Sequence, residues 1–189
     1  MKILSVDKIR DADAYTIKHE PISSLDLMER ASEKLFMWVC EHVDNKKSIE
    51  IFVGLGNNGG DGLALGRMLM NEGYEVSINV LRYSDNITDD FQINYDRLLD
   101  LDKHVVKNIS SLDEFNAVDE NTVIIDAIFG SGLSRPVIGF TGKIINEINK
   151  SKSIVIAIDI PSGLFSDVTS KNNGGAIINA DYTDRKSVV

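Results

Sequence analysis

A glycine-rich loop that links an apolar run to a helical pattern places the strongest constraint on the fold of this chain. Residues 49–53 are apolar in the manner of a buried strand, and residues 63–70 have the spacing of a helix. A strand, a glycine loop and a helix in this order direct backbone N–H groups at the helix start toward an anion. The segment therefore predicts an anion-binding loop in an α/β fold.

The polar residues of this loop set it apart from an ordinary phosphate loop. Residues 54–59 have the glycine spacing of a dinucleotide fingerprint, which on its own is a weak signal. The loop also contains Asn57 and Asn58, and Asp61 follows it. A carboxylate at this place would repel a phosphate, so the amide pair and the acid indicate chemistry or cation binding at the loop.

The rest of the chain alternates between short apolar runs and helical patterns. We expect N-terminal helices at 5–19 and 25–43, strands at 49–53, 75–81, 104–106, 122–128 and 153–160, and helices at 61–72, 89–100, 112–118 and 142–150. The runs 123–125 and 154–158 are apolar on both faces, which is typical of a parallel sheet covered by helices. We predict a Rossmann-like, doubly wound α/β fold with a mostly parallel sheet, helices on both faces, and the two extra N-terminal helices packed on the sheet.

Composition narrows the class of protein. The 189 residues suit one domain, and a net charge of −9 argues against nucleic-acid or anionic-membrane binding. The single Cys40 excludes a disulfide framework and fits a reducing cytoplasm. No long apolar run or signal peptide is present, so we expect a soluble cytoplasmic protein. We expect Cys40, Met28 and Trp38 in the core, and treat the three histidines as structural or surface residues.

Three carboxylates stand at or near the ends of predicted strands. Asp61 follows the first glycine loop, Asp126 begins a second polar, glycine-rich segment, and Asp159 begins a third. Ligands of open parallel sheets bind beyond the carboxyl ends of the strands, and a buried charge is costly without a partner. The alternative interpretation is that Asp61 only charges a helix N-terminus and that Asp126 and Asp159 cap turns.

A nicotinamide dehydrogenase is disfavoured by the end of the second predicted strand. Hydride-transfer enzymes of this fold hold the cofactor ribose with an acid there, whereas residues 78–82 contain none. A generic nucleotide-binding Rossmann domain would bind intact NAD tightly, which the loop chemistry also disfavours. Arg82 lies where a 2′-phosphate would be met, and an exposed arginine without a function is an equal alternative.

The polar segments together resemble the NAD(P)H-hydrate epimerase family, in the N-terminal domain of the YjeF type. The resemblance extends from the N-terminus to about Thr183 and rests on residues 27–31, 54–63, 126–133, 157–163 and 180–183. It implies an isomerase of metabolite repair that interconverts the 6R and 6S forms of hydrated NADH and NADPH. The runner-up interpretation is a non-catalytic binding or dimerisation module of the same fold.

The resemblance also implies a ligand set. It places one potassium ion per subunit on Asn58, Asp126 and Ser162. It places the substrate on the following residues: Asn57, Asn58, Gly59, Gly60, Asp61, Gly130, Ser131, Gly132, Leu133, Ser134, Arg135, Pro136 and Asp159. Oxygen atoms of amide, hydroxyl and carboxylate groups suit a hard cation, which would also neutralise carboxylates near a pyrophosphate.

Asp159 is our candidate for the acid–base residue. It closes the most apolar strand, so desolvation suits it to hold or release a proton, and the rigid Pro161 turn fixes its direction. Asp126 is assigned to the cation, and Asp61 lies nearer the phosphate loop.

The ends of the chain bear on its organisation. We expect residues 1–183 to form the domain, truncated at its C-terminus, and residues 184–189 to be a non-native or disordered tail that resembles a translated sequencing adapter. The resemblance leaves open whether the full-length protein continues into the C-terminal dehydratase domain that many bacterial relatives carry. Apolar residues of the N-terminal helices, among them Phe36 and Met37, favour a homodimer.

Overall fold

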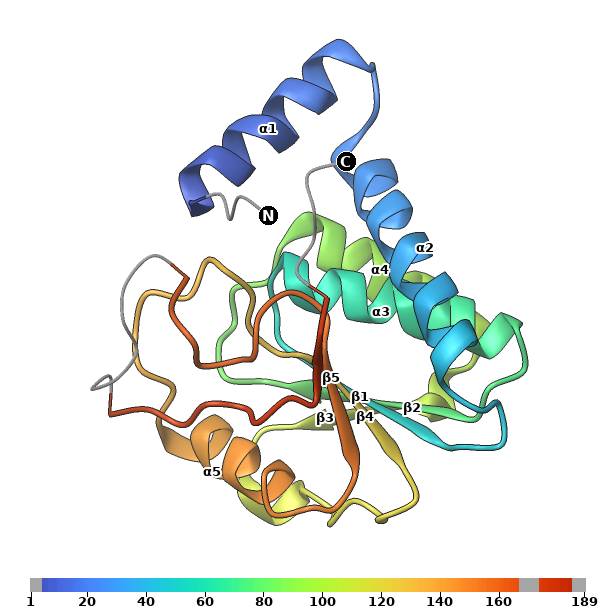
Figure 1. Cartoon of the computed structure of the whole chain (residues 1–189), viewed down its shortest axis with the longest axis vertical. Helices are drawn as coiled ribbons and strands as arrows, with labels where there is room; N and C mark the ends of the chain where they lie inside the picture. Colours follow the sequence, from blue (N-terminus) through green and yellow to red (C-terminus); the bar gives the residue numbers. More distant parts are fainter. Residues whose placement is uncertain (1–4, 167–173, 185–189) are drawn as a thin grey trace.

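One parallel sheet organises the part of the chain that the computed structural model describes, residues 5–166 and 174–184 (Figure 1). Its strand order is β3-β2-β1-β4-β5-β6. The strands are β1 Ile49–Val53, β2 Val76–Leu81, β3 Val106–Ile109, β4 Val123–Ala127, β5 Ile154–Ala157 and β6 Tyr182–Thr183. All neighbouring strands pair in parallel. The predicted Rossmann-like fold is confirmed.

The order of the strands fixes where a ligand can bind. The chain moves outward from β1 to β3, returns to β4 beside β1, and then moves outward in the other direction. Val53 pairs with Ala127, so β1 and β4 end side by side. A crevice opens where the strand order reverses, at the carboxyl ends of the strands.

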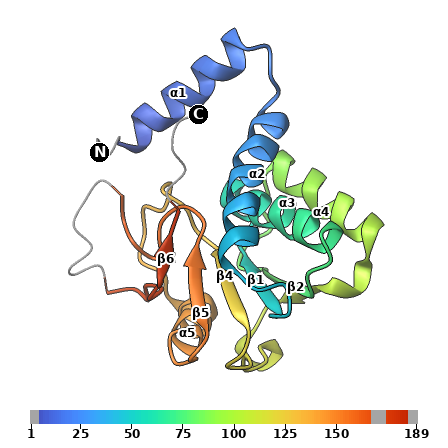
Figure 2. The ribbon, with the colours of Figure 1, turned by 45° about the vertical axis from the view of Figure 1, so that its right-hand side comes forward.

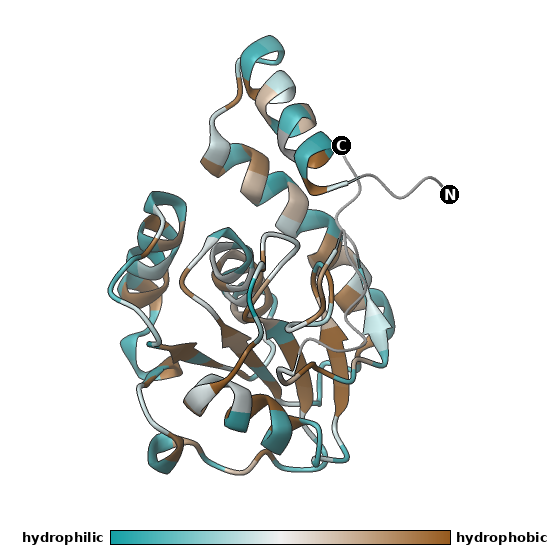
Figure 3. Ribbon diagram, turned by 90° about the vertical axis from the view of Figure 1, so that its left-hand side faces the viewer, coloured by the Kyte–Doolittle hydropathy of each residue, from teal (hydrophilic) through white to brown (hydrophobic). Residues whose placement is uncertain are grey.

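Helices cover both faces of the sheet (Figure 2). Helices α2 (Ser24–His42), α3 (Asn57–Asn71) and α4 (Asp89–Leu101) cover one face, and α5 (Gly139–Ile148) covers the other. This arrangement follows from the right-handed connections between parallel strands. Hydrophobic residues concentrate in the strands and on the helix faces that cover them, as Figure 3 shows.

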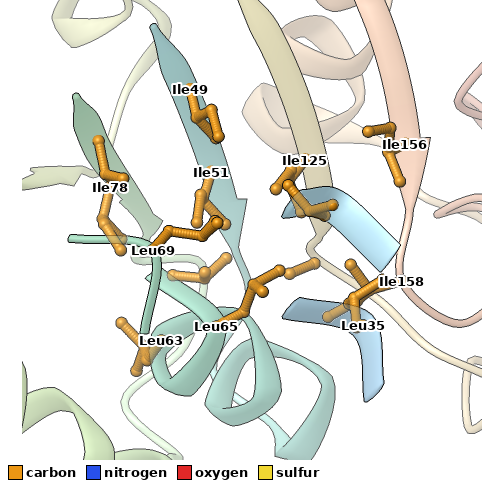
Figure 4. Packing of buried hydrophobic residues seen from close by; sticks show 14 of the residues in the cluster. Leu35, Ile49, Ile51, Leu63, Leu65, Leu69, Ile78, Ile125, Ile156 and Ile158 are labelled. Atoms are coloured by element: carbon orange, nitrogen blue, oxygen red, sulfur yellow. The ribbon is translucent and has the colours of Figure 1, made fainter. Parts of the chain in front are cut away.

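Alternation along the strands divides the core into two layers. Ile49 and Ile51 of β1 point toward Leu63, Leu65 and Leu69 of α3 (Figure 4). The residue between Ile51 and Val53, Phe52, packs on the other face with side chains of α5. Since both faces of the strand are buried, the apolar run of residues 49–53 has no polar stripe.

An ion-pair network joins the three helices on the first face. Glu29 of α2 is 2.9 Å from Arg97 of α4 and also pairs with Arg67 of α3, at 2.5 Å. The Glu29 side chain is only 20% exposed. Removal of its charge would leave two arginines without their partner in a half-buried place.

The expectation that both N-terminal helices pack on the sheet is wrong for the first of them. Helix α1 (Val6–His19) ends two residues before Pro21 and projects away from the sheet (Figure 1). Its sequence is mostly polar and offers only a narrow apolar stripe, whereas α2 buries Leu35 and Val39 in the core.

Two short elements also differ from the prediction. Residues 103–105 form a 3-10 turn, capped by the Asp102 side chain, and the strand begins only at Val106. The helix expected at 112–118 is a single turn, Leu112–Glu114. Phe115 leaves that turn in an extended conformation, and its ring packs 6.0 Å from the ring of Phe52, so burial of the aromatic side chain ends the helix.

Individual side chains test the core assignments. Met28 is buried and Trp38 packs partly buried against the core, as expected. Cys40 is exposed, which contradicts the core assignment, because it lies on the outer side of the last turn of α2. The three histidines, His19, His42 and His104, are exposed.

The C-terminal strand was not predicted, because two residues carry no measurable alternation. Tyr182 and Thr183 form β6 at the edge of the sheet, and the backbone N–H of Asp184 donates to the carbonyl of Ala157. The rest of the predicted tail, residues 185–189, lies outside the described residues. None of the described helices is long and apolar enough to cross a membrane.

Candidate functional site

The loops after β1, β4 and β5 meet at one cleft of about 510 Å³ at the carboxyl edge of the sheet. The described residues that line it are Val6, Ile9, Asp13, Gly56, Asn57, Asn58, Tyr83, Thr88, Ile128, Phe129, Gly130, Ser131, Gly132, Leu133, Ser134, Arg135 and Asp159. The cleft therefore lies where the strand order places a ligand site.

Close backbone contacts explain the glycines of the first loop. The N–H of Gly54 donates to the carbonyl of Ala127, and a Cβ on Gly54 would lie only 1.9 Å from the Ile128 carbonyl oxygen. A Cβ on Gly59 would lie 2.0 Å from the carbonyl oxygen of Gly54. Only glycine lets the start of α3 approach the ends of β1 and β4 this closely.

The start of α3 faces the cleft. The helix begins at Asn57, its N-cap is Gly56, and no side chain caps it. Gly56, Asn57 and Asn58 all line the cleft. The first N–H groups of a helix have no partner within the helix, so this end can bind an anionic group of a ligand.

Asp126 is buried and satisfied by its neighbours. Its carboxylate, 1% exposed, accepts hydrogen bonds from the Ser162 hydroxyl at 2.5 Å, the Ser162 N–H at 2.8 Å and the Ile128 N–H at 3.2 Å. Burial raises the pKa of Asp126 to about 6, the hydrogen bonds oppose this shift, and the charge of Asp159 adds to it.

Ser162 connects two of the loops. It is fully buried after β5, and its hydroxyl oxygen lies 2.8 Å from the N–H of Phe129, which follows β4. Through this contact and the bond to Asp126, the third polar segment is fixed against the second.

Asp159 and Asn58 meet at Gly130. The Ser131 N–H donates to Oδ2 of Asp159 at 2.7 Å. A Cβ on Gly130 would lie 2.7 Å from that same oxygen and 3.3 Å from the Asn58 side chain. The carboxylate and the amide thus adjoin one glycine from opposite loops, inside the cleft.

The Asn58 amide is the unusual group of the site. Its Oδ1 and Nδ2 are both buried, and neither has a hydrogen-bond partner among the described residues. Buried side-chain amides are nearly always satisfied in folded proteins. An oxygen-seeking cation would satisfy Oδ1, and a hydrogen-bond acceptor on a polar ligand would satisfy Nδ2. The described residues contain no cluster of three His, Cys, Asp or Glu side chains suited to a metal.

Some of the predicted substrate contacts lie outside the cleft lining, namely Gly59, Gly60, Asp61 and Pro136. A Cβ on Gly60 would lie 2.9 Å from the Met28 sulfur, so Gly60 serves the packing of α2 on α3. Asp61 is 3% exposed, and its carbonyl accepts a hydrogen bond from Ser32 of α2.

The cleft also contains residues that sequence reasoning missed. Tyr83 and Thr88 follow β2, and Val6, Ile9 and Asp13 belong to α1. The strand pattern could have indicated Tyr83, since it stands just beyond a predicted strand end. No sequence signal ties α1 to the cleft.

Strand order, a helix N-terminus at the switch point and buried carboxylates beside it define a Rossmann-like, doubly wound α/β protein with a ligand-binding cleft. The family model described as YjeF-related protein N-terminus matches residues 24–183. The chain belongs to this family, which confirms the resemblance seen in the sequence.

Curated relatives support the same assignment. The chain is 38% identical to the NAD(P)H-hydrate epimerase of Lentilactobacillus buchneri, over 87% of this chain and 74% of the relative. It is 32% identical to the NAD(P)H-hydrate epimerase of Anaerococcus prevotii, over 96% and 83%. It is also 32% identical to the bifunctional NAD(P)H-hydrate repair enzyme Nnr of Thermofilum pendens, over 97% of this chain and 35% of that protein.

A solved structure supports the fold. The crystal structure of yeast ynu0 superposes with a TM-score of 0.76, at 23% identity, over 97% of this chain and 79% of the yeast chain.

Proposed function

We propose that this protein is an isomerase, an NAD(P)H-hydrate epimerase that interconverts the 6R and 6S forms of hydrated NADH and NADPH. One observation carries the proposal: an unpartnered buried amide, Asn58, and a carboxylate, Asp159, adjoin each other in a cleft at the switch point. The names of the curated relatives support the choice of substrate.

The reaction needs acid–base chemistry at a ring carbon. Inversion at C6 breaks and remakes the bond to the hydroxyl, or opens the ring, beside a nitrogen whose lone pair stabilises the developing cation. The hydroxyl is a poor leaving group and must be protonated, and water on the other face must then lose a proton. Such catalysis is worth about 10²–10⁴ in rate, and a nearby carboxylate also stabilises the positive charge on the ring.

Asp159 suits this task by its geometry. Its carboxylate is 7% exposed and lines the cleft. Ser131 holds Oδ2, and Oδ1 makes no hydrogen bond within the described residues, so one oxygen remains for the substrate. The pyrophosphate of the dinucleotide would lie at the start of α3.

The test replaces Asp159→Asn and follows conversion of the pure 6R hydrate to the 6S form by chromatography. We expect turnover to fall at least about a hundredfold while the fold and much of the ligand binding remain. Asp61→Asn tests the alternative acid in parallel, and because that carboxylate is buried outside the cleft lining we expect its turnover to fall less than that of Asp159→Asn. Near wild-type turnover by the Asp159 variant would move the assignment to Asp61.

A potassium ion bound by Asn58, Asp126 and Ser162 is part of the proposal. These residues provide amide, carboxylate and hydroxyl oxygens, the ligand types that hard cations prefer, and the buried Asn58 amide lacks a partner among the described residues. We expect potassium to raise the melting temperature relative to tetramethylammonium, and Asn58→Ala to abolish the difference. Equal melting temperature and activity in both salts would reject the ion.

We also propose a homodimer built partly on α2. Met37 is 52% exposed, and Phe36 and Trp38 remain partly exposed beside it. An apolar surface of this kind is typical of an interface between subunits. Light scattering at high micromolar concentration should give twice the monomer mass, and a strictly monomeric mass would reject the proposal.

A further inference from the structure

Tyr83 lies against the glycine loop from the side of β2. It lines the cleft, and its phenol oxygen accepts a hydrogen bond from the Leu55 N–H at 3.1 Å. A Cβ on Gly54 would lie 3.0 Å from the same oxygen. The phenol therefore lies next to the loop that leads into α3, where N–H groups face the cleft.

Two contacts fix the position of the phenol. The Tyr83 ring packs against Phe129 with ring centres 5.1 Å apart. The Leu55 peptide that donates to the phenol is itself held, since its carbonyl accepts from the N–H of Thr88 at 3.2 Å. A side chain held in place in this way loses little conformational entropy when it binds a ligand.

The phenol still has a hydrogen to donate. A neutral phenol carries one hydrogen, and no described residue accepts it from Tyr83. Burial raises the pKa of Tyr83, so the hydroxyl stays protonated at neutral pH. The hydrogen bond accepted from Leu55 polarises the hydroxyl and strengthens it as a donor.

We propose that Tyr83 is a substrate-binding residue that donates its phenol hydrogen to a pyrophosphate oxygen of the dinucleotide. The Leu55 N–H is occupied by the phenol and cannot reach a phosphate, so Tyr83 replaces it as the donor at this point of the loop. The N–H groups at the start of α3, which lines the same cleft, would bind the same pyrophosphate. This proposal rests on the assignment of a pyrophosphate-linked nucleotide to the cleft.

The experiment measures binding of ADP-ribose, which carries the pyrophosphate and no nicotinamide ring, by calorimetry. Tyr83→Phe keeps the ring and removes the hydroxyl. We expect its affinity to fall about tenfold or more, because the lost hydrogen bond is to a charged group. Tyr95→Phe is the matched control, since it removes a phenol that contacts Asn108 outside the cleft lining, and its affinity should match the wild type.

NMR spectra of the unliganded Tyr83→Phe variant distinguish direct ligand contact from a purely structural role, through the backbone amide resonances of residues 54–58. Resonances that stay in place, apart from Leu55, together with lost affinity support direct contact. Unchanged affinity, loop-wide shifts that accompany the loss, or no saturable ADP-ribose binding by the wild type would overturn the proposal. A wild type that binds ADP-ribose through Tyr83 but does not convert the 6R hydrate would reject only the epimerase reaction.

Discussion

The buried carboxyl of Asp126 should make folding stability fall as the pH rises. Burial raises its pKa from 3.8 to about 6, so the folded protein keeps a proton that the unfolded chain releases. Below about pH 4 both states are protonated and the group costs nothing. Between about pH 4 and pH 6 only the folded state keeps the proton, so each step upward in pH favours the unfolded chain, and the effect is complete above the folded pKa.

The size of the effect follows from the shift. A displacement from 3.8 to about 6 corresponds to about 3 kcal/mol of unfolding free energy. Asp126→Asn cannot ionise, so its stability should decline less than that of the wild type between pH 4 and pH 7, by about this amount. The assay is urea unfolding at a series of pH values in tetramethylammonium buffer, and the readout is the slope against pH.

The absolute stability of the variant is not the readout, because in either orientation the NH2 group of the new amide meets a backbone N–H, of Ser162 or of Ile128, and destabilises the fold at every pH. Asp181→Asn is the matched comparison, because this exposed carboxylate also accepts a backbone N–H, and the slope of Asp126→Asn is compared with the slope of this variant as well as with that of the wild type. Parallel slopes for wild type and Asp126→Asn, within about 1 kcal/mol over this pH range, would refute the reasoning.

Three further substitutions test the packing of the fold and the cleft. Gly54→Ala should cost about 3 kcal/mol in urea unfolding, because its Cβ would lie 1.9 Å from a backbone oxygen, while Gly56→Ala meets nothing within 4 Å and should cost less than about 1 kcal/mol. Glu29→Gln should cost about 2 kcal/mol by the same assay, since it breaks the half-buried network of Glu29 with two arginines. The control is Glu20→Gln, which breaks a separate, more exposed ion pair with Arg30 and should cost under about 0.5 kcal/mol. Gly130→Ala should lower epimerase turnover about tenfold or more with a smaller loss of stability, because the methyl group enters the cleft. Turnover equal to that of the wild type would show that the loop around Gly130 shifts to accommodate the methyl group.

The sheet was predictable because its signals are local. Residues 123–125 and 154–158 are apolar on both faces, and the structure places residues 123–125 in β4 and residues 154–157 in the neighbouring strand β5 of the parallel sheet. The prediction of a helix at 112–118 was wrong because its apolar residues pack with the core on the α5 side of the sheet, and Phe115 does so from an extended conformation. The projection of α1 away from the sheet could not be predicted either, since an amphipathic pattern does not indicate which surface the helix packs against.

The site was predictable where strand ends carry polar residues. Topology brings the loops after β1, β4 and β5 to one edge, so Asn58, Asp126, Asp159 and Ser162 could be grouped from their order alone. Tyr83 also stands just beyond a predicted strand end, but the sequence does not encode its hydrogen bond to Leu55, on which our proposal for Tyr83 rests.

Burial and hydrogen bonding give the three acids of the site different capacities. Asp126 lies outside the cleft lining, and both its carboxylate oxygens accept hydrogen bonds from Ser162 or Ile128, so it holds the loops together. Asp61 is buried on α3 outside the cleft lining. Asp159 lines the cleft, and only one of its carboxylate oxygens is held by a hydrogen bond within the described residues, from the Ser131 N–H. The position of this second oxygen in the cleft is the difference between the three acids that supports our proposal of Asp159, and neither Asp126 nor Asp61, as the acid–base residue.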